Sequence, residues 1–273
     1  LIRNADLGYL FLPSYPSAIA WIILRIWGKP HIVYGADDWV KASDSMFRWE
    51  GSRQSLFYRS YAFLNKVMEK KIVGTALFGV AAGGQLIKKY ISFGCDTYPT
   101  IPRMTLSMQD IYEREDTCMG EYVEIVNVGG LIHDKAQHYL LQAFAFALQK
   151  HKNLRLKIIG EGPERKNLTA LAKNLGISSK VSFVGYVESE TTLYSYLQNS
   201  DMFVLSSVTE GFPRVLYEAM CMRLPIVTSN VGGIPHLLKH NKNALIMEAG
   251  DVQQLSHEIC RIVQDQDLRK QLI

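Results

Sequence analysis

Two carboxylates with seven residues between them, Glu210 and Glu218, are the side chains of this chain best placed to do chemistry. Glu218 lies in the run VLYEAMCM, which predicts a helix that is apolar almost all round. A buried, ionised carboxylate needs a partner, because an unpaired one costs several kcal/mol. The two hydroxyls of a ribose could be that partner, as could a nearby arginine, Arg214 or Arg223. The sequence alone leaves both possibilities open.

The start of the same helix predicts an anion site. Pro213 fits the first helical position. The next three backbone amides would then have no partner within the helix, and they belong to Arg214, Val215 and Leu216. Amides at a helix N-terminus, together with the helix dipole, favour a phosphate or a diphosphate. Because Glu210 stands in the loop before this helix, we expect it at the mouth of the same site.

The elements around these residues predict an α/β protein. Strand-like runs alternate with helical patterns along the whole chain, which is typical of parallel sheets covered on both faces. In the first part, the runs LGYLFL, HIVYGADD and KIVGTALFGV predict strands. Residues 91–118 contain two prolines and no clean period, so we take them as a linker. The predicted domains are 1–118, which includes this linker, and 119–273.

The second domain is expected to hold the ligand. In open α/β sheets, ligands bind at the carboxyl ends of the strands, near the point where the strand order reverses. Glycines follow three strand candidates there: Gly129 with Gly130, Gly160 with Gly162, and Gly185. Such glycines either let the backbone approach a ligand or simply allow the turn. The domain has neither G-x-x-x-x-G-K-[ST] nor a complete G-x-G-x-x-G after its first strand, which argues against a P-loop NTPase and a dinucleotide cofactor.

The composition and the net charge limit which other functions the chain could have. The 273 residues have room for two domains and are 48% hydrophobic and 21% charged, as in globular proteins. The net charge of +4 is too small to imply nucleic acid. Residues 1–95 carry 12 Lys and Arg against 6 Asp and Glu. This excess is consistent with an anionic acceptor or a membrane surface, and equally with ordinary variation.

Neither the cysteines nor the most apolar stretch indicates a special environment. The four cysteines are scattered, without a CxxC pair or a histidine at metal-ligand spacing. Residues 7–27 are apolar over about the ~20 positions that a membrane-spanning helix needs, but Pro13, Pro16 and Arg25 interrupt them. A short strand, a proline turn and a helix explain this stretch better, and no signal-peptide pattern precedes it. We expect a reduced, cytoplasmic protein without a structural metal.

Four ordered motifs carry a resemblance to a known family. E-G-F-P-x-x-x-x-E-A-M at 210–220, followed by L-P-I-V-T-S-N-V-G-G-I-P, resembles the signature of the retaining glycosyltransferases of family 4. V-G-G-L-I-H-D-K at 128–135, I-I-G-E-G-P at 158–163 and V-x-F-x-G-Y-V at 181–187 precede it in the family's order. The similarity is close from about Asn127 to Asp251 and looser over residues 1–118.

The resemblance implies a GT-B fold, with two Rossmann-like domains that bind a nucleotide-sugar as substrate, and no metal or cofactor. By motif position, Glu218 would hold the ribose hydroxyls, Glu210 would contact the donor sugar, and Lys135 would neutralise the diphosphate. Asp37, at the end of the strand HIVYGADD, would orient the acceptor, although it could equally cap the next helix. The implied donor-binding positions are Glu218, Gly211, Phe212, Pro213, Arg214, Val215, Leu216, Gly129, Gly130, Gly160, Tyr186 and Val187.

Three positions depart from the family pattern. Gly130 stands where the family usually has a diphosphate-binding arginine, Ala136 where it has a glycine, and His236 where a glutamate commonly ends G-G-x-P-E. The glycine-rich loop of the first βα unit is missing, so we expect a fragment with an incomplete N-terminal domain and little sugar transfer on its own.

The predicted function is metal-independent transfer of a hexosyl-type sugar, with retention, from a UDP-, GDP- or similar nucleotide-sugar. The acceptor would be a polysaccharide, a lipid-linked or a small molecule, at a cytoplasmic location that could include the inner face of the membrane. Two alternatives remain: a non-catalytic nucleotide- or sugar-binding protein, and a nucleotide-sugar epimerase of the same architecture.

Overall fold

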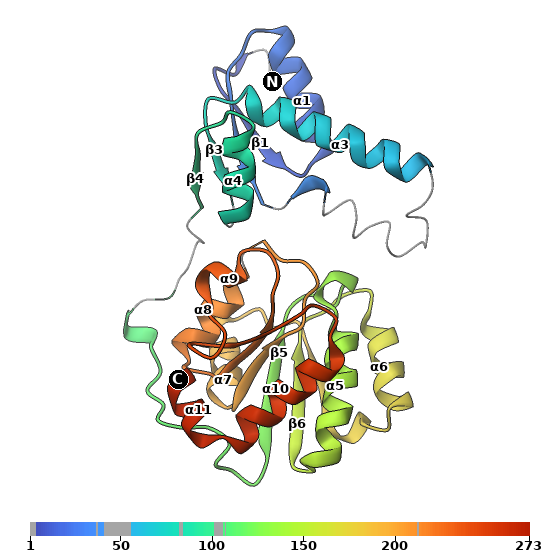
Figure 1. Ribbon diagram of the computed structural model, residues 1–273, viewed down its shortest axis with the longest axis vertical. Helices are drawn as coiled ribbons and strands as arrows, with labels where there is room; N and C mark the ends of the chain where they lie inside the picture. The colour runs from blue at the N-terminus through green and yellow to red at the C-terminus, as the bar shows by residue number, and fades with distance from the viewer. Residues whose placement is uncertain are drawn as a thin grey trace. The chain divides into compact units, whose positions relative to one another are not determined.

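The computed structural model describes residues 4–36, 38–40, 56–81, 84–100, 106, 108–211 and 213–273. The chain divides into two compact units, one formed by Leu1–Pro102 with Glu210–Phe212 and the other by Arg103–Thr209 with Pro213–Ile273 (Figure 1). Each unit contains one parallel sheet, with four strands in the first and six in the second. The predicted α/β class with two parallel sheets is confirmed.

In the first unit, the strands follow one another in the order β1-β2-β3-β4. The apolar stretch that could have been a membrane helix is a strand and a helix, as predicted, and Ser14 caps the helix by accepting a hydrogen bond from the backbone N–H of Ser17. Within the described residues, no helix is long and apolar enough to cross a membrane. The elements are β1 Gly8–Leu12, α1 Tyr15–Ile26, β2 His31–Gly35, α3 Leu56–Gly74, β3 Gly79–Ala81, α4 Gly84–Ser92 and β4 Thr97–Pro99.

The three helices described for the first unit, α1, α3 and α4, lie on the same face of its sheet. Right-handed crossovers between sequential parallel strands place every connection on one side. A Cβ added to Gly8 would meet Leu24 of α1, and one added to Gly35 would meet Tyr90 of α4. Gly8 pairs with His31, whose ring bonds the carbonyl of Ile72 in α3, so these positions share a face.

The opposite face of this sheet keeps large apolar side chains in solvent. Strand residues alternate between the two faces, so the neighbours of the buried set point the other way. Tyr9 and Phe11 of β1 and Tyr98 of β4 remain 62%, 48% and 59% exposed. The sequence predicted a sheet covered on both faces; among the described residues, α1, α3 and α4 cover one face, and no described helix covers the other.

Two local predictions in the first unit are also wrong. The run KIVGTALFGV was expected to be a strand, but Lys71–Gly74 complete α3 and the strand is only Gly79–Ala81. Ile72 and Val73 favour strands locally, yet they are fully buried on α3, so burial overrides propensity. Within the expected linker, Thr97–Pro99 form β4 beside β3. A strand of three residues is too short to show an alternation of apolar and polar residues in the sequence.

In the second unit, the strand order is β10-β9-β8-β5-β6-β7, and every pair is parallel. The order reverses between the neighbours β5 and β8, which makes this the switch point. Its elements are β5 Val123–Val128, η3 His133–Lys135, α5 Gln137–Lys150, β6 Leu154–Ile159, α6 Arg165–Asn174, η4 Ser178–Lys180, β7 Val181–Gly185, α7 Glu190–Gln198, β8 Met202–Leu205, α8 Arg214–Cys221, β9 Ile226–Ser229, α9 Ile234–Leu237, β10 Leu245–Met247, α10 Val252–Gln264 and α11 Gln266–Leu272.

Two apolar cores cover the two faces of this second sheet. One contains Leu140 and Phe144 of α5 with Ile259 of α10. The other contains Leu216 and Ala219 of α8 with residues of β8 and β9. Each fully buried Leu, Ile or Phe contributes about 1.5–3 kcal/mol of burial, so the central strands are firmly held. Their carboxyl ends are therefore a rigid base for the loops that follow.

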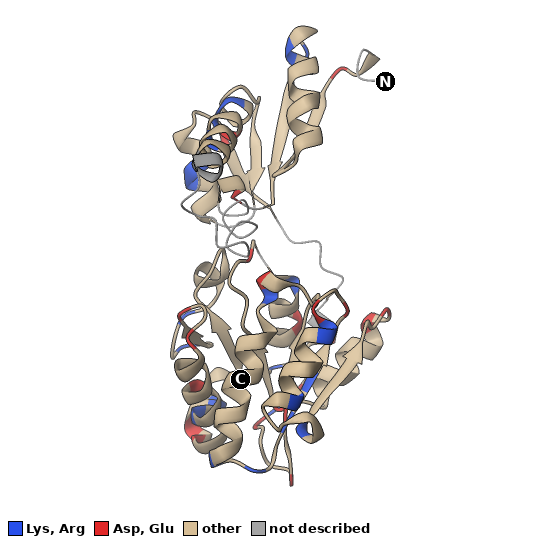
Figure 2. Cartoon of the chain, turned by 90° about the vertical axis from the view of Figure 1, so that its right-hand side faces the viewer, with Lys and Arg blue, Asp and Glu red and all other residues tan. Residues whose placement is uncertain are grey.

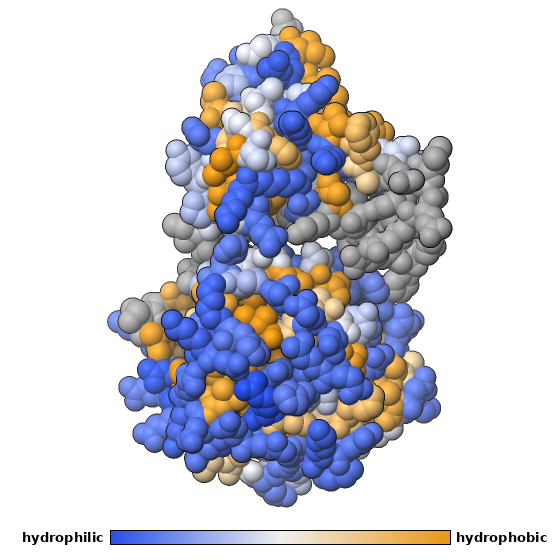
Figure 3. Space-filling view, in the orientation of Figure 1, coloured by the Kyte–Doolittle hydropathy of each residue, from blue (hydrophilic) through white to orange (hydrophobic). Residues whose placement is uncertain are grey.

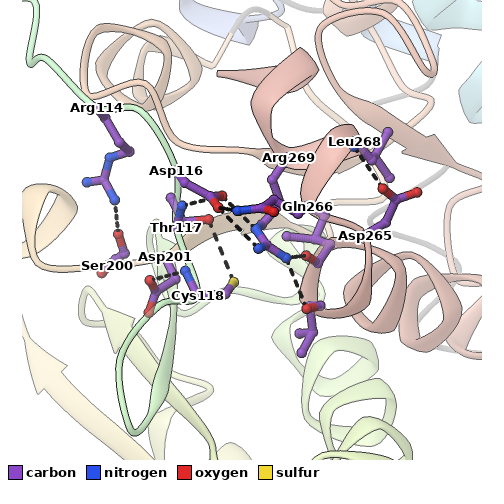
Figure 4. Close-up of polar contacts among 12 residues, drawn as sticks. Arg114, Asp116, Thr117, Cys118, Ser200, Asp201, Asp265, Gln266, Leu268 and Arg269 are labelled. Atoms are coloured by element: carbon purple, nitrogen blue, oxygen red, sulfur yellow. Dashed lines mark hydrogen bonds and ion pairs between the residues drawn. The ribbon is translucent and has the colours of Figure 1, made fainter.

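The segment before β5 is fixed to the second unit by buried polar contacts (Figure 4). The guanidinium of Arg114 donates to the carbonyls of Gln198 and Ser200, both at 2.8 Å. Arg269 of α11 pairs with Asp116 at 2.8 Å, with both side chains at most 10% exposed. The Arg269 guanidinium lowers the pKa of Asp116 from 3.8 to about 2. From Arg114 onward, the linker therefore packs on the second unit.

Candidate functional site

The loops after β5 and β8 meet at the switch point. The two strands pair directly, with Val126 beside Phe203. Beyond them, the backbone N–H of Val208 donates to the carbonyl of Asp134 at 2.9 Å. The hydroxyl of Ser206 donates to the carbonyls of Lys135 and Ala136, both at 3.2 Å. These bonds join the segment that carries Lys135 to the loop that continues to Glu210.

The ends of β6 and β7 continue the same row. The N–H of Gly129 donates to the carbonyl of Ile159, and the N–H of Gly160 donates to that of Gly185. A Cβ on Gly160 would lie 2.0 Å from the carbonyl oxygen of Gly129, and one on Gly162 would lie 2.3 Å from that of Leu131. From the sequence, these glycines could serve either to allow a turn or to let a ligand approach. The structure gives a sufficient reason for both Gly160 and Gly162, because the neighbouring loop backbones are too close for any side chain.

Gly130 differs from these tight glycines, because a side chain would fit there. A Cβ at this position would have one neighbour within 4 Å, the carbonyl oxygen of Glu161 at 3.9 Å. The side-chain amide of Gln137 donates to the carbonyl of Gly130 at 3.1 Å and holds the loop. The position where the resemblance leads us to expect an arginine is thus sterically open.

Lys135 and Ala136 connect the β5 loop to α5. A Cβ on Gly129 would lie 3.8 Å from Cδ of Lys135, so the lysine stem runs along the glycine pair. Ala136 is the N-cap of α5 and has φ 51°, in the left-handed region. This conformation favours glycine, which is the residue that the family pattern has here. Having alanine instead of glycine at position 136 therefore strains the backbone there.

Helix α8 starts one residue later than predicted. Pro213 is its N-cap rather than its first helical residue, and no side chain caps this terminus. The N–H of Leu216 donates to the carbonyl of Pro213 at 3.2 Å, so the prediction that this amide lacks a partner is wrong. A bond of the 3₁₀ type tightens the first turn. The anion site expected at this terminus therefore rests on Arg214 and Val215.

Among the described residues, the polar contact of the Glu218 carboxylate is a loose ion pair. Its side chain is 13% exposed, and Oε1 lies 4.0 Å from the guanidinium of Arg214. Arg214 also lies 3.8 Å from the carboxylate of Glu190 in α7. Burial raises the pKa of Glu218, and Arg214 opposes that rise only in part. The sequence offered an arginine or a ribose as the partner of Glu218. Arg214 is present, but its attraction does not offset the cost of removing the carboxylate from water, and the pKa of Glu218 stays raised.

The remaining predicted residues follow β7 and β8. Glu210 is 8% exposed in the loop after β8, followed by Gly211, which is half-buried. Tyr186 is 75% exposed and Val187 half-buried at the end of β7. Two predicted site residues, Asp37 and Phe212, lie outside the described residues.

Sequence reasoning missed three polar residues of this site. Ser206 and Gln137 hold the β5 loop through carbonyl oxygens, and Glu190 shares Arg214 with Glu218. Ser206 directly follows the last residues of a strand, which is a signal that could have been used. Gln137 and Glu190 give no such signal, because helix-start polar residues are common. Among the described residues, no group of three or more His, Cys, Asp or Glu could hold a metal ion.

The comparisons with known proteins agree with the motifs. Residues 112–273 match the family described as glycosyl transferases group 1. An uncharacterized glycosyltransferase of Haemophilus influenzae is 32% identical over 149 residues, which are 54% of this chain and 41% of that protein. The lipopolysaccharide core biosynthesis glycosyltransferase LpsE of Rhizobium meliloti is 30% identical over 148 residues, 54% of this chain and 42% of its own length. The chain thus spans less than half the length of these curated relatives.

The fold also matches solved structures. The crystal structure of Anabaena Alr3699/HepE in complex with UDP superposes with a TM-score of 0.73, over 99% of this chain and 72% of that one. Its sequence identity is 19%, so this similarity concerns the fold alone. The two parallel-sheet units are those of the GT-B fold, as the resemblance implied.

Proposed function

The chain belongs to the glycosyl transferases group 1 family, and we propose that it transfers a hexosyl-type sugar from a nucleotide-sugar to an acceptor hydroxyl, with retention of configuration. The observation that carries this proposal is the junction at the switch point. There, hydrogen bonds join the β5 loop with Lys135 to the β8 loop that leads to Glu210 and α8. Ligands of open α/β sheets bind at such a point.

The diphosphate of the donor is proposed to lie between Lys135 and the start of α8. In the reaction, the bond from the sugar carbon to the diphosphate breaks, the acceptor oxygen bonds to the same carbon, and the proton of the acceptor hydroxyl passes to the departing diphosphate. Negative charge grows on the diphosphate as it leaves, and a cation together with helix N–H groups stabilises that charge. The terminus of α8 has no side-chain cap that would compete for its amides. This arrangement needs no metal ion.

The nucleoside is proposed to bind through Glu218. Its carboxylate is nearly buried, its pKa is raised by burial, and its ion pair is long. Two ribose hydroxyls could donate hydrogen bonds to this carboxylate, for which the described residues supply no donor closer than the long ion pair. Glu210 and the following backbone at Gly211 and Pro213 would contact the sugar, and Gly160, Tyr186 and Val187 would line the nucleoside side.

The acceptor is proposed to bind the first unit, with Asp37 orienting its hydroxyl. Support comes from the basic excess of residues 1–95 and from the Rhizobium meliloti relative, which is named for lipopolysaccharide core biosynthesis. A polysaccharide or lipid-linked acceptor fits both observations, and a small molecule is the third possibility. Work on such acceptors would place the protein in the cytoplasm, at the inner face of the membrane.

A second candidate function is nucleotide-sugar binding without transfer. Gly130 favours it, because the site lacks the arginine that the family pattern places there and the space is open.

The deciding experiment incubates the chain with UDP-, GDP- and ADP-sugars and a panel of acceptors, followed by mass spectrometry of the products and NMR of the anomeric linkage. A new α-linkage from an α-donor supports transfer with retention. Nucleotide binding without even a trace of product supports the second function, because an incomplete N-terminal domain is expected to slow transfer rather than abolish it. A product of inverted configuration contradicts the proposal.

A further inference from the structure

The side chain of Arg214 lies between two carboxylates at the start of α8. Its Nη2 atom is 3.8 Å from Oε1 of Glu190 in α7 and 4.0 Å from Oε1 of Glu218. Both distances are longer than the ~2.7–3.2 Å of an N–H···O hydrogen bond. The side chain is 52% exposed. The two carboxylates therefore attract Arg214 through charge, without fixing its guanidinium in place.

Charged residues are frequent over the second unit, and most need no special explanation. Figure 2 shows Lys, Arg, Asp and Glu positions spread along its helices and loops, and Figure 3 shows that much of its surface in that view is hydrophilic. Exposed ion pairs contribute little to stability, because water and salt screen them. Arg214 differs from such pairs, because one of its two carboxylates, Glu218, is nearly buried.

Glu218 regains from Arg214 only part of what burial costs it. Burial raises the pKa of the Glu218 carboxyl, the charge of Arg214 opposes this rise, and the carboxylate of Glu190 adds to it. A ribose that donates two hydrogen bonds would satisfy Glu218 better than a guanidinium at 4.0 Å does. When a nucleoside bonds to Glu218, Arg214 would therefore lose its nearly buried partner.

The contacts and the position of Arg214 both favour an anion as its next partner. A guanidinium has five N–H donors in a fork that fits two phosphate oxygens. For the side-chain donors of Arg214, the described residues offer no acceptor at hydrogen-bond distance. Arg214 is also the first residue of α8, where the helix dipole disfavours a cation. An anion bound to the guanidinium would use the donors and offset that unfavourable charge.

A nucleotide would bring such an anion with its ribose. The 5′-phosphate is attached to the same sugar ring as the two hydroxyls assigned to Glu218. Arg214 lies one helical turn before Glu218, on the same face of α8. The diphosphate is proposed to lie between Lys135 and the start of α8, so the path from Glu218 to that diphosphate passes Arg214.

We propose that Arg214 exchanges partners when a nucleotide binds: the ribose takes its place at Glu218, and its guanidinium turns to the 5′-phosphate while Glu190 stays beside it. The inference rests on the proposed function, because it assumes the ribose contact of Glu218. To that function it adds a side chain that makes the site prefer nucleotides to nucleosides.

The test measures, by NMR titration of the chain, the dissociation constants of the nucleoside, 5′-monophosphate and 5′-diphosphate of uracil, guanine and adenine. Arg214→Gln should raise the dissociation constants of the mono- and diphosphate about tenfold or more, because a charge-assisted hydrogen bond is lost. The constant of the nucleoside of the same base should change by less than about threefold. Arg214→Lys keeps the charge but not the fork, so it should keep part of the preference for nucleotides.

The matched control is Arg155→Gln, because Arg155 is also about half-exposed and has a long ion pair, 3.7 Å from Glu124. It lies at the amino end of β6, whereas the ligand loops follow the carboxyl ends. This variant should bind every probe like the unaltered chain, and circular dichroism should show all variants folded. Equal weakening of nucleoside and nucleotides by Arg214→Gln, or no weakening, would overturn this inference and leave the proposed nucleotide site intact. Failure of every probe to bind the unaltered chain would overturn both.

Discussion

The two units use the same alternation of strand and helix, yet they cover their sheets differently. In the first unit, sequential strand order puts α1, α3 and α4 on one face, and one apolar core results. In the second, the order reverses at β5 and β8, so helices cover both faces and two cores form. A reversal also creates the gap between neighbouring loops where ligands bind. Among the described residues, the second unit therefore contains the larger core and most residues of the candidate donor site, whereas Glu210 and Gly211 are grouped with the first unit.

The comparison predicts that the first unit depends most on its buried ion pair. Lys89→Met would leave the carboxylate of Glu69 buried. Among the described residues, its Oε1 already has no partner, and the Trp39 N–H would be its remaining donor. Breaking a buried pair in this way should lower the free energy of unfolding by about 3 kcal/mol or more. Urea denaturation measures the loss, and Lys88→Met, at the exposed position beside it, should change it little. A loss of less than about 1 kcal/mol would mean that the pair does not support the core.

The second unit is expected to be most sensitive in its glycine loops. Gly162→Ala would place a methyl group 2.3 Å from the carbonyl oxygen of Leu131. Because the clash is with backbone, one of the two loops must move to relieve it. We expect a loss of about 2–3 kcal/mol in unfolding free energy. Gly130→Ala is the control in the same row of loops, because its Cβ has 3.9 Å of room. Similar losses in the two variants would show that the loops are not packed as described.

The buried ion pair of the second unit should contribute less than that of the first. Ionised Asp116 has a folded-state pKa of about 2 against 3.8. It therefore stabilises the chain above pH 3.8 by about 2 kcal/mol, and this contribution is lost as the pH falls from about 4 to 2. Asp116→Asn should remove it at pH 7.

Unfolding free energies of the unaltered chain and Asp116→Asn, measured between pH 7 and the acid limit, check this expectation. The difference between the two proteins should shrink as the pH falls through that window. A difference that is independent of pH would contradict the role of the Asp116 charge.

The smallest expected effect is at Ala136, where a local rule is broken. An alanine in the left-handed region costs about 1–2 kcal/mol, which a glycine would relieve. Part of that relief is lost, because glycine also has a freer unfolded state. Ala136→Gly should therefore raise the unfolding free energy by about 0.5–1 kcal/mol. Ala172→Gly, inside α6, should instead lower it by about 1 kcal/mol. A destabilised Ala136→Gly variant would show that the alanine methyl group is needed for packing.

Much of the second unit could be predicted from the sequence, and less of the first. Four motifs at strand ends located the β5, β6, β7 and β8 loops, because glycine and charge cluster where strands finish. In the first unit, Ile72 and Val73 suggested a strand, and only their burial on α3 reveals the helix. Which face of a sheet is covered depends on strand order, and one sequence does not show it.

At the candidate site, residue types were easier to predict than partners. Spacing alone made Arg214 a possible partner of Glu218, and the structure adds that the pair is long and shared with Glu190. The bond from Leu216 to Pro213 reflects local backbone geometry, which composition does not encode. Asp37 and Phe212 remain predictions, because they lie outside the described residues.

The central claim is that the second unit binds a nucleotide-sugar through Glu218 and the start of α8. Calorimetry of the chain with UDP, GDP and ADP, repeated with Glu218→Gln and Glu210→Gln, tests it most directly. We predict binding of at least one nucleotide, with Glu218→Gln weakening it by about 1.5–3 kcal/mol because a charge-assisted hydrogen bond is lost. Glu210→Gln should weaken it less, because Glu210 is assigned to the sugar. No heat with any of the three nucleotides on folded protein, or equal losses in the two variants, would contradict the account.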